Sequence, residues 1–536
     1  MQVKRLSYLD VQGYFLSDLN HTSIKTALRI IFGVILVLII SWMIYFIVVT
    51  ISMPYQIEYR EGAAPVMTQF FLNGENPFSL RNQPLGMNNY GFIYSLFVTP
   101  FAALFGNTLL VHRIVTLFFM ILSSLLIFHT TSRVNSDRFF ALAGAVLVGM
   151  GLAARAGLGA YPSTMGMFLF LAGILIPFNR SFDSRALVLS AVLCVIAYYT
   201  KPYFVLAFGI VASYVFVFVS KRKGLFYSFL FVSIFAVSFI IVRFIFNFYF
   251  IDTIVSNLSN TTNNTFGYMG RQLVEFDKEF FPLLILGLTL IYLNIGKLKS
   301  RKVSFSRFFN NFLSLDQPLV SLPLNYIVYF FVFSSLTFTL VLGRNPGSYM
   351  NYIYQILLPP FSLLLFQYIK PLTRFAFIAS SLILLNMISF GQLRFNPVFL
   401  QQKDSSDWAR LYQAIGSSKH ILNNPLITSE MIRLGVPPVD SGQTEYYYFV
   451  EPYPDNILLG PNYQTLISGG GLYLNSINNS VTGTEYDKVF LTEGPGLSPL
   501  VPESMSRYYS QTDTITVGMP QVGQSFVVGI WEPVIN

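Results

Sequence analysis

Residues 27–51 read ALRIIFGVILVLIISWMIYFIVVTI, an apolar run with a single arginine near its start. A helix needs about 20 such residues to cross a bilayer, whereas strands of a membrane barrel alternate polar and apolar residues over about ten positions. The whole chain of 536 residues is 53% hydrophobic and only 11% charged, while soluble domains carry about a quarter charged residues. The sequence therefore predicts a polytopic α-helical membrane protein.

Further apolar segments follow the first run along the chain. They are 109–130, 139–156, 161–178, 186–200, 203–219, 224–246, 280–295, 324–342, 349–369 and 372–391. Basic clusters separate alternate segments, and Lys and Arg collect in cytoplasmic loops. This distribution predicts about eleven transmembrane helices, with the N-terminus inside and the C-terminus outside. Residues 1–26 then form a cytoplasmic N-terminus, and residues 27–391 form the transmembrane domain, which begins with a retained signal anchor.

Residues 52–108 form the first outer loop in this topology. Its segment 90–106, YGFIYSLFVTPFAALFG, is as apolar as several of the predicted spans. Counting it as a span would place the basic residues 221–223 and 297–307 outside the cell, against the usual charge bias. We therefore predict a juxtamembrane helix at 90–106, which lies in the outer interface or re-enters the membrane.

The composition changes after the last apolar segment. Residues 392–536 are rich in Ser, Asn, Gly, Pro, Gln and Tyr, and they are numerous enough for a small α/β domain. The segments 486–494, 513–520 and 525–534 are typical of strands, and 407–418 is typical of an amphipathic helix. The topology places this soluble domain outside.

Charge and cysteine content exclude several other kinds of protein. The net charge is +9, which loop orientation explains without a nucleic-acid partner. The single cysteine, Cys194, forms no internal disulfide and belongs to no cysteine-based metal site. No set of His and Asp ligands stands out, so we expect no obligatory metal or other cofactor, although the residues leave a divalent metal possible.

Cations on the outer side are the first indication of a ligand. This group consists of Arg113, Arg155, Lys201, Arg243, Arg271 and Arg344. Singly, such residues often contact lipid headgroups with a snorkelling side chain. Together on one face, they fit a lipid-linked phosphate, because Arg and Lys form charge-assisted hydrogen bonds with phosphate oxygens.

Two carboxylates lie at the outer end of the first span, in the stretch IEYREG at 57–62. Glu58 and Glu61 follow the helix-breaking Pro54, with Arg60 between them. One interpretation is a solvated carboxylate with a local partner such as Arg60. The other is a general base, because a partly desolvated carboxylate can take a proton from an acceptor.

The order YREG…FLNGENPF…NNYGFIYSLFVTPFAALFG…HRIVTLFF resembles the first outer loop of GT-C glycosyltransferases. It is most similar to the bacterial branch related to protein O-mannosyltransferases and lipid A aminoarabinose transferases. YYTKPYF (198–204) and GRNPGSYMNYIYQILLPP (343–360) also resemble stretches of that family. The resemblance covers most of the membrane region and, more loosely, the outer domain.

This resemblance implies transfer of a sugar from a polyprenyl-phosphate donor to an acceptor hydroxyl on the outer face, with inversion. By position, it implies Glu61 as the catalytic carboxylate and Glu58 as the second choice. Arg113, Lys201 and Arg344 match positions near the donor phosphate. The family often has an acidic residue after the arginine that ends the third span, and Arg155-Ala156-Gly157 lacks it. A site with two carboxylates or a bridging metal is therefore in doubt.

Two other functions stay open from the residues alone. One is a transporter or flippase of lipid-linked glycans, and the other is a glycan ligase or polymerase with a diphosphate-linked donor. The acceptor is a lipid, a glycan or a protein, and the outer domain is a candidate to hold it, with tyrosines at 446–448 and the loop 469–475. We expect a bacterial cytoplasmic membrane, with the active site on the periplasmic or extracellular side.

Overall fold

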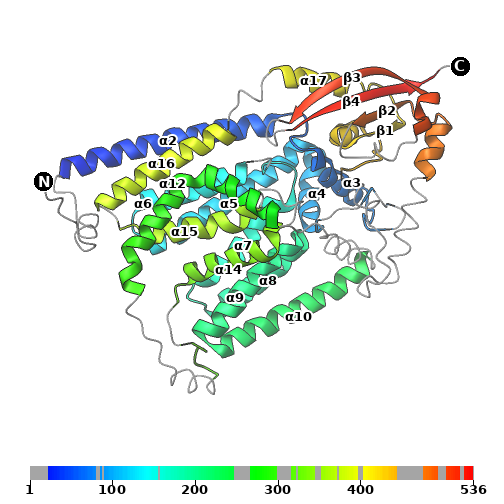
Figure 1. Ribbon diagram of the computed structural model, residues 1–536. Coiled ribbons are helices and arrows are strands. Elements are labelled where there is room, and N and C mark those ends of the chain that lie inside the picture. The colour runs from blue at the N-terminus through cyan, green and yellow to red at the C-terminus, as the bar shows by residue number, and fades with distance from the viewer. Residues whose placement is uncertain are drawn as a thin grey trace.

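The computed structural model describes residues 22–79, 82, 85–86, 90–154, 157–246, 266–298, 315–320, 324–344, 352–370, 373–395, 402–442, 475–492, 503–519 and 524–534. A bundle of long helices fills most of the molecule, and a small sheet packs at one end of it (Figure 1). This arrangement confirms the predicted fold class, a polytopic helical membrane protein with a small C-terminal α/β domain.

Each predicted apolar segment lies on a helix. In chain order these are α2 (Thr22–Ser52), α5 (Leu109–Val134), α6 (Arg138–Ala153), α7 (Pro162–Asn179), α8 (Ser184–Thr200), α9 (Leu206–Tyr214), α10 (Lys221–Phe246), α12 (Phe266–Leu298), α14 (Tyr326–Leu340), α15 (Leu358–Tyr368) and α16 (Arg374–Arg394). Among the described residues, seven helical stretches are long and apolar enough to cross a membrane. Because α6 and α8 have only 16 and 17 residues, the number of eleven spans stays a prediction.

Two contacts bring the start of α2, the connection between α5 and α6 and the end of α15 to one end of the bundle. At the end of the bundle where α2 begins, Arg29 forms an ion pair with Asp137 at 2.8 Å. The side chain of Asn135, just after α5, donates to the carbonyl of Phe366 near the end of α15 at 2.7 Å. These pairs join exactly those helix ends that the charge pattern assigns to the cytoplasm, although the side of the membrane itself stays a prediction.

The opposite end of the bundle carries the short helices and the C-terminal domain (Figure 1). Helix α3 (Ala63–Leu72) and helix α4 (Ile93–Phe105) lie there, and α4 has 13 residues. That length is too short to span a bilayer, as predicted for the juxtamembrane segment 90–106. Gly106, with φ of +86°, ends α4, and this left-handed backbone favours glycine.

The described part of the C-terminal domain contains a four-stranded sheet and helices at 402–413, 428–434 and 475–482. The strands are β1 (Ile421–Leu422), β2 (Lys488–Thr492), β3 (Tyr509–Met519) and β4 (Gln524–Pro533), in the order β1-β2-β4-β3. The predicted strands match β2, β3 and β4, whereas the helix α17 (Gln402–Gln413) begins earlier than predicted. Helix α18 (Thr428–Leu434) follows β1. The tyrosines at 446–448 and nearly all of the loop 469–475 lie outside the described residues.

A short segment after α2 connects the bundle to this domain. The ring of Tyr55 stacks on that of Trp408, which is fully buried, with centroids 5.1 Å apart. Gln56 accepts a hydrogen bond from the backbone N–H of Ser429 at 3.1 Å. Residues 53–62 are therefore held between the membrane helices and the C-terminal domain.

Gly62 marks the tightest point of this contact. A Cβ atom at Gly62 would lie 2.7 Å from the Cβ of Thr428. Thr428 cannot move aside easily, because its hydroxyl is bound to the carbonyl of Asp440 and the amide of Asn423.

We expect Gly62→Ala to cost about 1–3 kcal/mol of unfolding free energy through overpacking, measured by chemical unfolding in mixed micelles. Gly267→Ala is the control, because no atom lies within 4 Å of its Cβ position, and an equal loss in both variants would contradict the expectation.

Candidate active site

The stretch between α2 and α3 folds into a single 3₁₀ turn, η1 (Tyr59–Gly62). Glu58 caps this turn, because its extended backbone (φ −156°, ψ 145°) lets its carboxylate accept the N–H of Arg60 at 2.9 Å. Acidic side chains at such a position satisfy an otherwise unpaired backbone donor. The cap and the turn place Glu58 and Glu61 in different surroundings.

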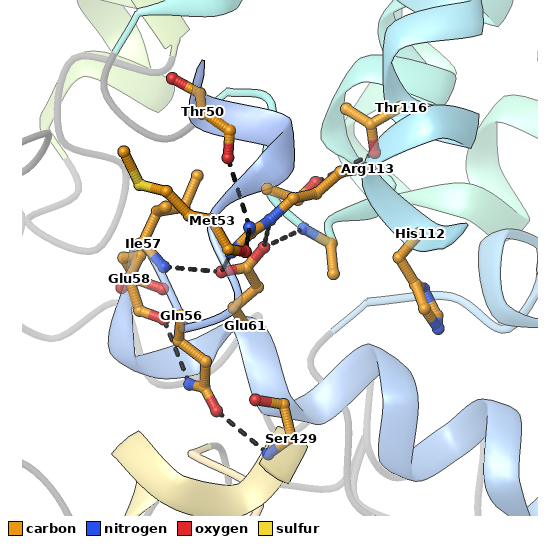
Figure 2. A network of polar contacts seen from close by, with 12 residues as sticks. Thr50, Met53, Gln56, Ile57, Glu58, Glu61, His112, Arg113, Thr116 and Ser429 are labelled. Atoms are coloured by element: carbon orange, nitrogen blue, oxygen red, sulfur yellow. Dashed lines mark hydrogen bonds and ion pairs between the residues drawn. The ribbon is translucent and has the colours of Figure 1, made fainter. Parts of the chain in front are cut away.

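Glu61 forms a fully buried ion pair with Arg113, the fifth residue of α5 (Figure 2). The Nε of Arg113 donates to Oε1 of Glu61 at 2.8 Å, and Nη2 donates to Oε2 at 2.9 Å. The backbone N–H of Ala160 also binds Oε1, at 2.9 Å, and that of Ile57 binds Oε2, at 2.8 Å. Each carboxylate oxygen thus accepts two hydrogen bonds, which uses its full capacity.

Arg113 is saturated in the same way. Its remaining N–H groups donate to the backbone carbonyls of Thr50, Met53 and Tyr55, at 3.3, 2.6 and 2.7 Å. An arginine has five N–H donors, and all of them are used here. The pair therefore joins the end of α2, the start of α5 and the connection before α7.

This geometry does not fit the roles predicted for these two residues. A carboxylate without a free lone pair and without solvent exposure cannot receive a proton from an acceptor hydroxyl. A guanidinium whose donors are all used inside the protein has none left for a donor phosphate. These contacts favour a structural role in which Glu61 and Arg113 hold the site in shape, and their catalytic and phosphate-binding roles stay predictions. His112 does not replace Glu61 as a base, because its ring points away from the pair (Figure 2) and Nε2 contacts Asn107 at 3.0 Å.

Glu58 has different surroundings. Its Oε1 accepts the Nε of Arg60 at 2.7 Å, and its Oε2 accepts the backbone N–H of Arg60 and the hydroxyl of Tyr161. In the contacts described for this residue, Oε1 keeps one acceptor position. The carboxylate side chain is 6% exposed, and that of Arg60 beside it is 20% exposed. A ligand can therefore reach the guanidinium and approach the carboxylate.

Lys201 lies close to this pair, at the end of α8. Its ammonium group donates to the hydroxyl of Ser163 at 2.9 Å, and lies 4.5 Å from the ring centre of Tyr90 and 5.1 Å from that of Tyr203. Tyr90 comes near because the N–H of Gly91 donates to the carbonyl of Thr200 at 3.1 Å.

Gly91 is required for this approach. A Cβ atom there would lie 1.7 Å from the carbonyl oxygen of Tyr199, so a larger residue would push the loop away from α8. The glycine therefore keeps Tyr90 against the ammonium group of Lys201.

A π-helical turn, η7 (Ile353–Leu357), completes the cluster. Such turns insert one extra residue per turn and often occur at functional sites. The hydroxyl of Tyr203 donates to the side chain of Gln355 in this turn, and the ring of Tyr352 meets that of Tyr203 edge-on with centroids 4.7 Å apart. Glu58, Arg60, Tyr90, Tyr161, Ser163, Lys201, Tyr203, Tyr352 and Gln355 together are called the outer cluster below.

Burial changes the acid–base properties of two residues in the outer cluster. Burial, with a smaller contribution from the positive charge of Arg60, lowers the pKa of Lys201 to about 7. Burial and the negative charge of Glu58 raise the pKa of Tyr161 well above its ordinary value. Tyr161 therefore stays a protonated donor to Glu58, whereas Lys201 titrates near neutral pH.

The other predicted cations lie elsewhere or outside the described residues. Arg155 falls outside them. Arg243 and Arg271 have exposed side chains on α10 and α12, and the guanidinium of Arg344 lies 4.3 Å from the ring centre of Phe266. A role for these residues at a donor phosphate stays a prediction. Among the described residues, no group of three or more His, Cys, Asp or Glu side chains could hold a metal ion, so the divalent metal stays untested.

Several members of the outer cluster did not stand out in the sequence. Tyr161 and Ser163 flank Pro162, which occupies the first position of α7, and this signal indicates a helix start without indicating a site. Tyr90 belongs to the stretch NNYGF, where only the following glycine hinted at a close backbone approach.

No protein-family model matches the chain, and no curated protein matches it. Similar solved structures include ArnT from Cupriavidus metallidurans bound to undecaprenyl phosphate, with a TM-score of 0.49, and ArnT from the same organism in the apo state, with a TM-score of 0.43. Both are 12% identical to this chain, and each match covers 92% of this chain and 97% of the other. Each match extends over nearly the whole of this chain.

Proposed function

We propose that this protein is a membrane glycosyltransferase that moves a sugar from a polyprenyl-phosphate donor to an acceptor hydroxyl. The observation that carries the proposal is the outer cluster, where a carboxylate with an open acceptor position, Glu58, lies near a buried lysine, Lys201. Arg60 is bound to Glu58, and its charge contributes to the lowered pKa of Lys201. A base beside two cations suits attack by a hydroxyl with a phosphate as leaving group.

The chemistry assigns one task to each group. The acceptor oxygen forms a bond to the anomeric carbon while the bond from that carbon to the phosphate oxygen breaks. Glu58 takes the acceptor proton, and the electron pair of the broken bond stays on the polyprenyl phosphate. Direct displacement inverts the anomeric configuration. The leaving phosphate is already a stable anion, so it needs cationic partners such as Lys201 and Arg60 rather than a general acid.

The position of the cluster supports a membrane-bound donor. The cluster lies at the ends of α7 and α8 and beside η7, on the face of the bundle that also carries α3, α4 and the C-terminal domain. A polyprenyl chain can stay in the bilayer while its phosphate reaches helix ends. The predicted topology makes this the outer face of a bacterial cytoplasmic membrane.

Bond cleavage separates this proposal from transport. Purified protein in liposomes is given a radiolabelled pool of polyprenyl-phosphate sugars together with lipid, glycan and protein fractions as acceptors. We expect release of polyprenyl phosphate and label in one of the acceptor fractions. Donor that crosses the bilayer intact, without release of polyprenyl phosphate, would instead support a flippase.

Donor binding should depend on pH through Lys201. The free protein loses the ammonium charge as pH rises through about 7, whereas a bound phosphodiester favours the charged lysine, so binding takes up a proton. We expect donor affinity to fall by up to roughly tenfold per pH unit between pH 7 and 9, measured by equilibrium binding in nanodiscs. Lys201→Arg should bind the donor with a flatter profile, because guanidinium stays charged. A wild-type profile already flat over this range would remove Lys201 from the phosphate site.

A further inference from the structure

A cavity lies between α3 and the C-terminal domain, and no residue of the outer cluster lines it. Its volume is about 280 Å³, slightly below the roughly 300–1,000 Å³ of ordinary ligand pockets, so it suits one small ring system. It is lined by Val66, Gln69, Phe70, Asn73, Leu85, Ile432, Gly435, Val436, Pro437 and Pro438. None of these described lining residues carries an ionisable side chain.

One wall of the cavity is a single face of α3. Three other lining residues, Gln69, Phe70 and Asn73, lie three, four and seven positions after Val66. The four side chains therefore share one side of the helix. Gln69 and Phe70 are partly exposed and Asn73 is exposed. This wall therefore presents an apolar surface with two amides near its end.

The opposite wall is a short segment after α18. Gly435, in the left-handed region with φ of +73°, ends the helix. The segment 436–438 is fixed at both ends, because the N–H of Val436 donates to the carbonyl of Met431 at 2.9 Å, and that of Val439 donates to the side chain of Asn423 at 2.6 Å. Its two prolines have no N–H group, so they offer flat, apolar faces. The cavity is thus preformed.

A chain of amide hydrogen bonds ends in this cavity. The amide nitrogen of Asn107 donates to the carbonyl of Pro65 at 2.9 Å, which fixes the orientation of that side chain. The same nitrogen donates to Oε1 of Gln69 at 3.2 Å, and Nε2 of Gln69 donates to Oδ1 of Asn73 at 3.0 Å. Each step fixes the next, so the chain ends at the amide of Asn73, a residue that lines the cavity and whose Nδ2 carries the last N–H donors.

We propose that this cavity binds a neutral sugar unit, and that this unit belongs to the acceptor. An uncharged ligand fits walls without ionisable groups, its hydroxyl oxygens can accept from Asn73, and its C–H faces can pack on Phe70 and Pro438. An acyl chain would offer no acceptor to the N–H groups at Nδ2 of Asn73, at a cost in binding free energy. The assignment to the acceptor rests on the proposed function.

The connection between the cavity and η1 supports this assignment. The turn that holds Glu58 ends at Gly62, and α3 begins at Ala63. At 1.5 Å per residue, the cavity face at 66–73 lies roughly 8–18 Å along the helix from Glu61. The cavity therefore lies within the length of a glycan of a few units from the turn that follows Glu58.

Saturation-transfer NMR on the protein in nanodiscs tests sugar binding without any donor. The probes are the methyl glycosides of glucose, galactose, mannose and N-acetylglucosamine. We expect transfer to at least one of them, weakened roughly tenfold or more by Asn73→Asp, which keeps the acceptor for Gln69 and replaces the N–H donors. Pro438→Trp, which fills the cavity, should abolish it. Asn479→Asp makes the same charge change at an exposed position of the C-terminal domain and should leave binding unchanged.

The outcomes separate this site from the catalytic proposal. The wild type could show no sugar transfer while glycosides still bind, also in the Glu58→Gln protein. That result would support the sugar site and reject the transferase. If the wild type transfers sugar and the glycoside signals are unchanged in Asn73→Asp and Pro438→Trp, the sugar site alone would be rejected. Absence of any glycoside signal, or a signal from a neutral Gly-Ala-Ser-Gly peptide amide instead, would also overturn it.

Discussion

Replacing Glu61 with glutamine is expected to destabilise the fold by about 3–5 kcal/mol, the usual cost of removing one partner from a buried ion pair. The change leaves the charge of Arg113 buried without a counter-charge. The new amide N–H₂ would also face donors, because both carboxylate oxygens now accept from N–H groups of Arg113 and of the backbone. The measurement is the free energy of unfolding in mixed micelles.

A double-mutant cycle distinguishes a structural role from a catalytic one. Arg113→Met alone leaves the Glu61 charge buried without a counter-charge and removes the guanidinium bonds to the carbonyls of Thr50, Met53 and Tyr55. The double variant should cost clearly less than the sum of the single variants, because neither charge is then left alone. Loss of glycosyl transfer should follow loss of folded protein. A Glu61→Gln protein with wild-type stability and no transfer would show that Glu61 acts in the reaction after all.

Replacing Glu58 with glutamine should have the opposite signature. We expect transfer to fall by about 10²–10⁴-fold, the range for removal of a general base, because an amide cannot take the acceptor proton. Stability should change little, since Glu58 lies beside a partly exposed arginine, and glutamine keeps an oxygen that can accept from Arg60 or Tyr161. Donor binding should also persist, because Lys201 is unchanged.

Tyr161→Phe is the matched control for that variant. It removes the hydroxyl that donates to Glu58 but keeps the carboxylate, so we expect a much smaller loss of transfer than for Glu58→Gln. The assay measures product formation at saturating donor, with equal amounts of folded protein. Normal turnover by a folded Glu58→Gln protein would exclude the assigned base.

The sequence predicted the helical framework well, because long apolar runs have few alternatives to a membrane helix. Charge alone also predicted that 90–106 does not span the membrane, and the structure gives it the 13-residue helix α4, while its outer location stays a prediction. Strand signals placed β2, β3 and β4 correctly. These features depend on residues that are close together in the sequence, so one sequence is enough to predict them.

The roles of the two carboxylates depended on distant residues. Glu58 and Glu61 are three positions apart, and nothing local distinguishes a cap from a buried partner of an arginine 52 residues away. Lys201 was identified as a cation, but its neighbours Ser163 and Tyr90 come from other parts of the chain. Side-chain pairing across helices decides such roles, and no periodicity encodes it.

The segment 53–62, held between bundle and C-terminal domain, has a consequence for how the protein matures. Gln56 and its partner Ser429 are 373 residues apart, and at about 5–20 residues per second the ribosome needs roughly 20–75 s to make the intervening chain. During that time Met53, Tyr55 and Ile57 lack the apolar partners that later bury them. The segment next to Glu58 is therefore packed only after the C-terminal domain is made, so chains truncated before that domain should transfer sugar poorly.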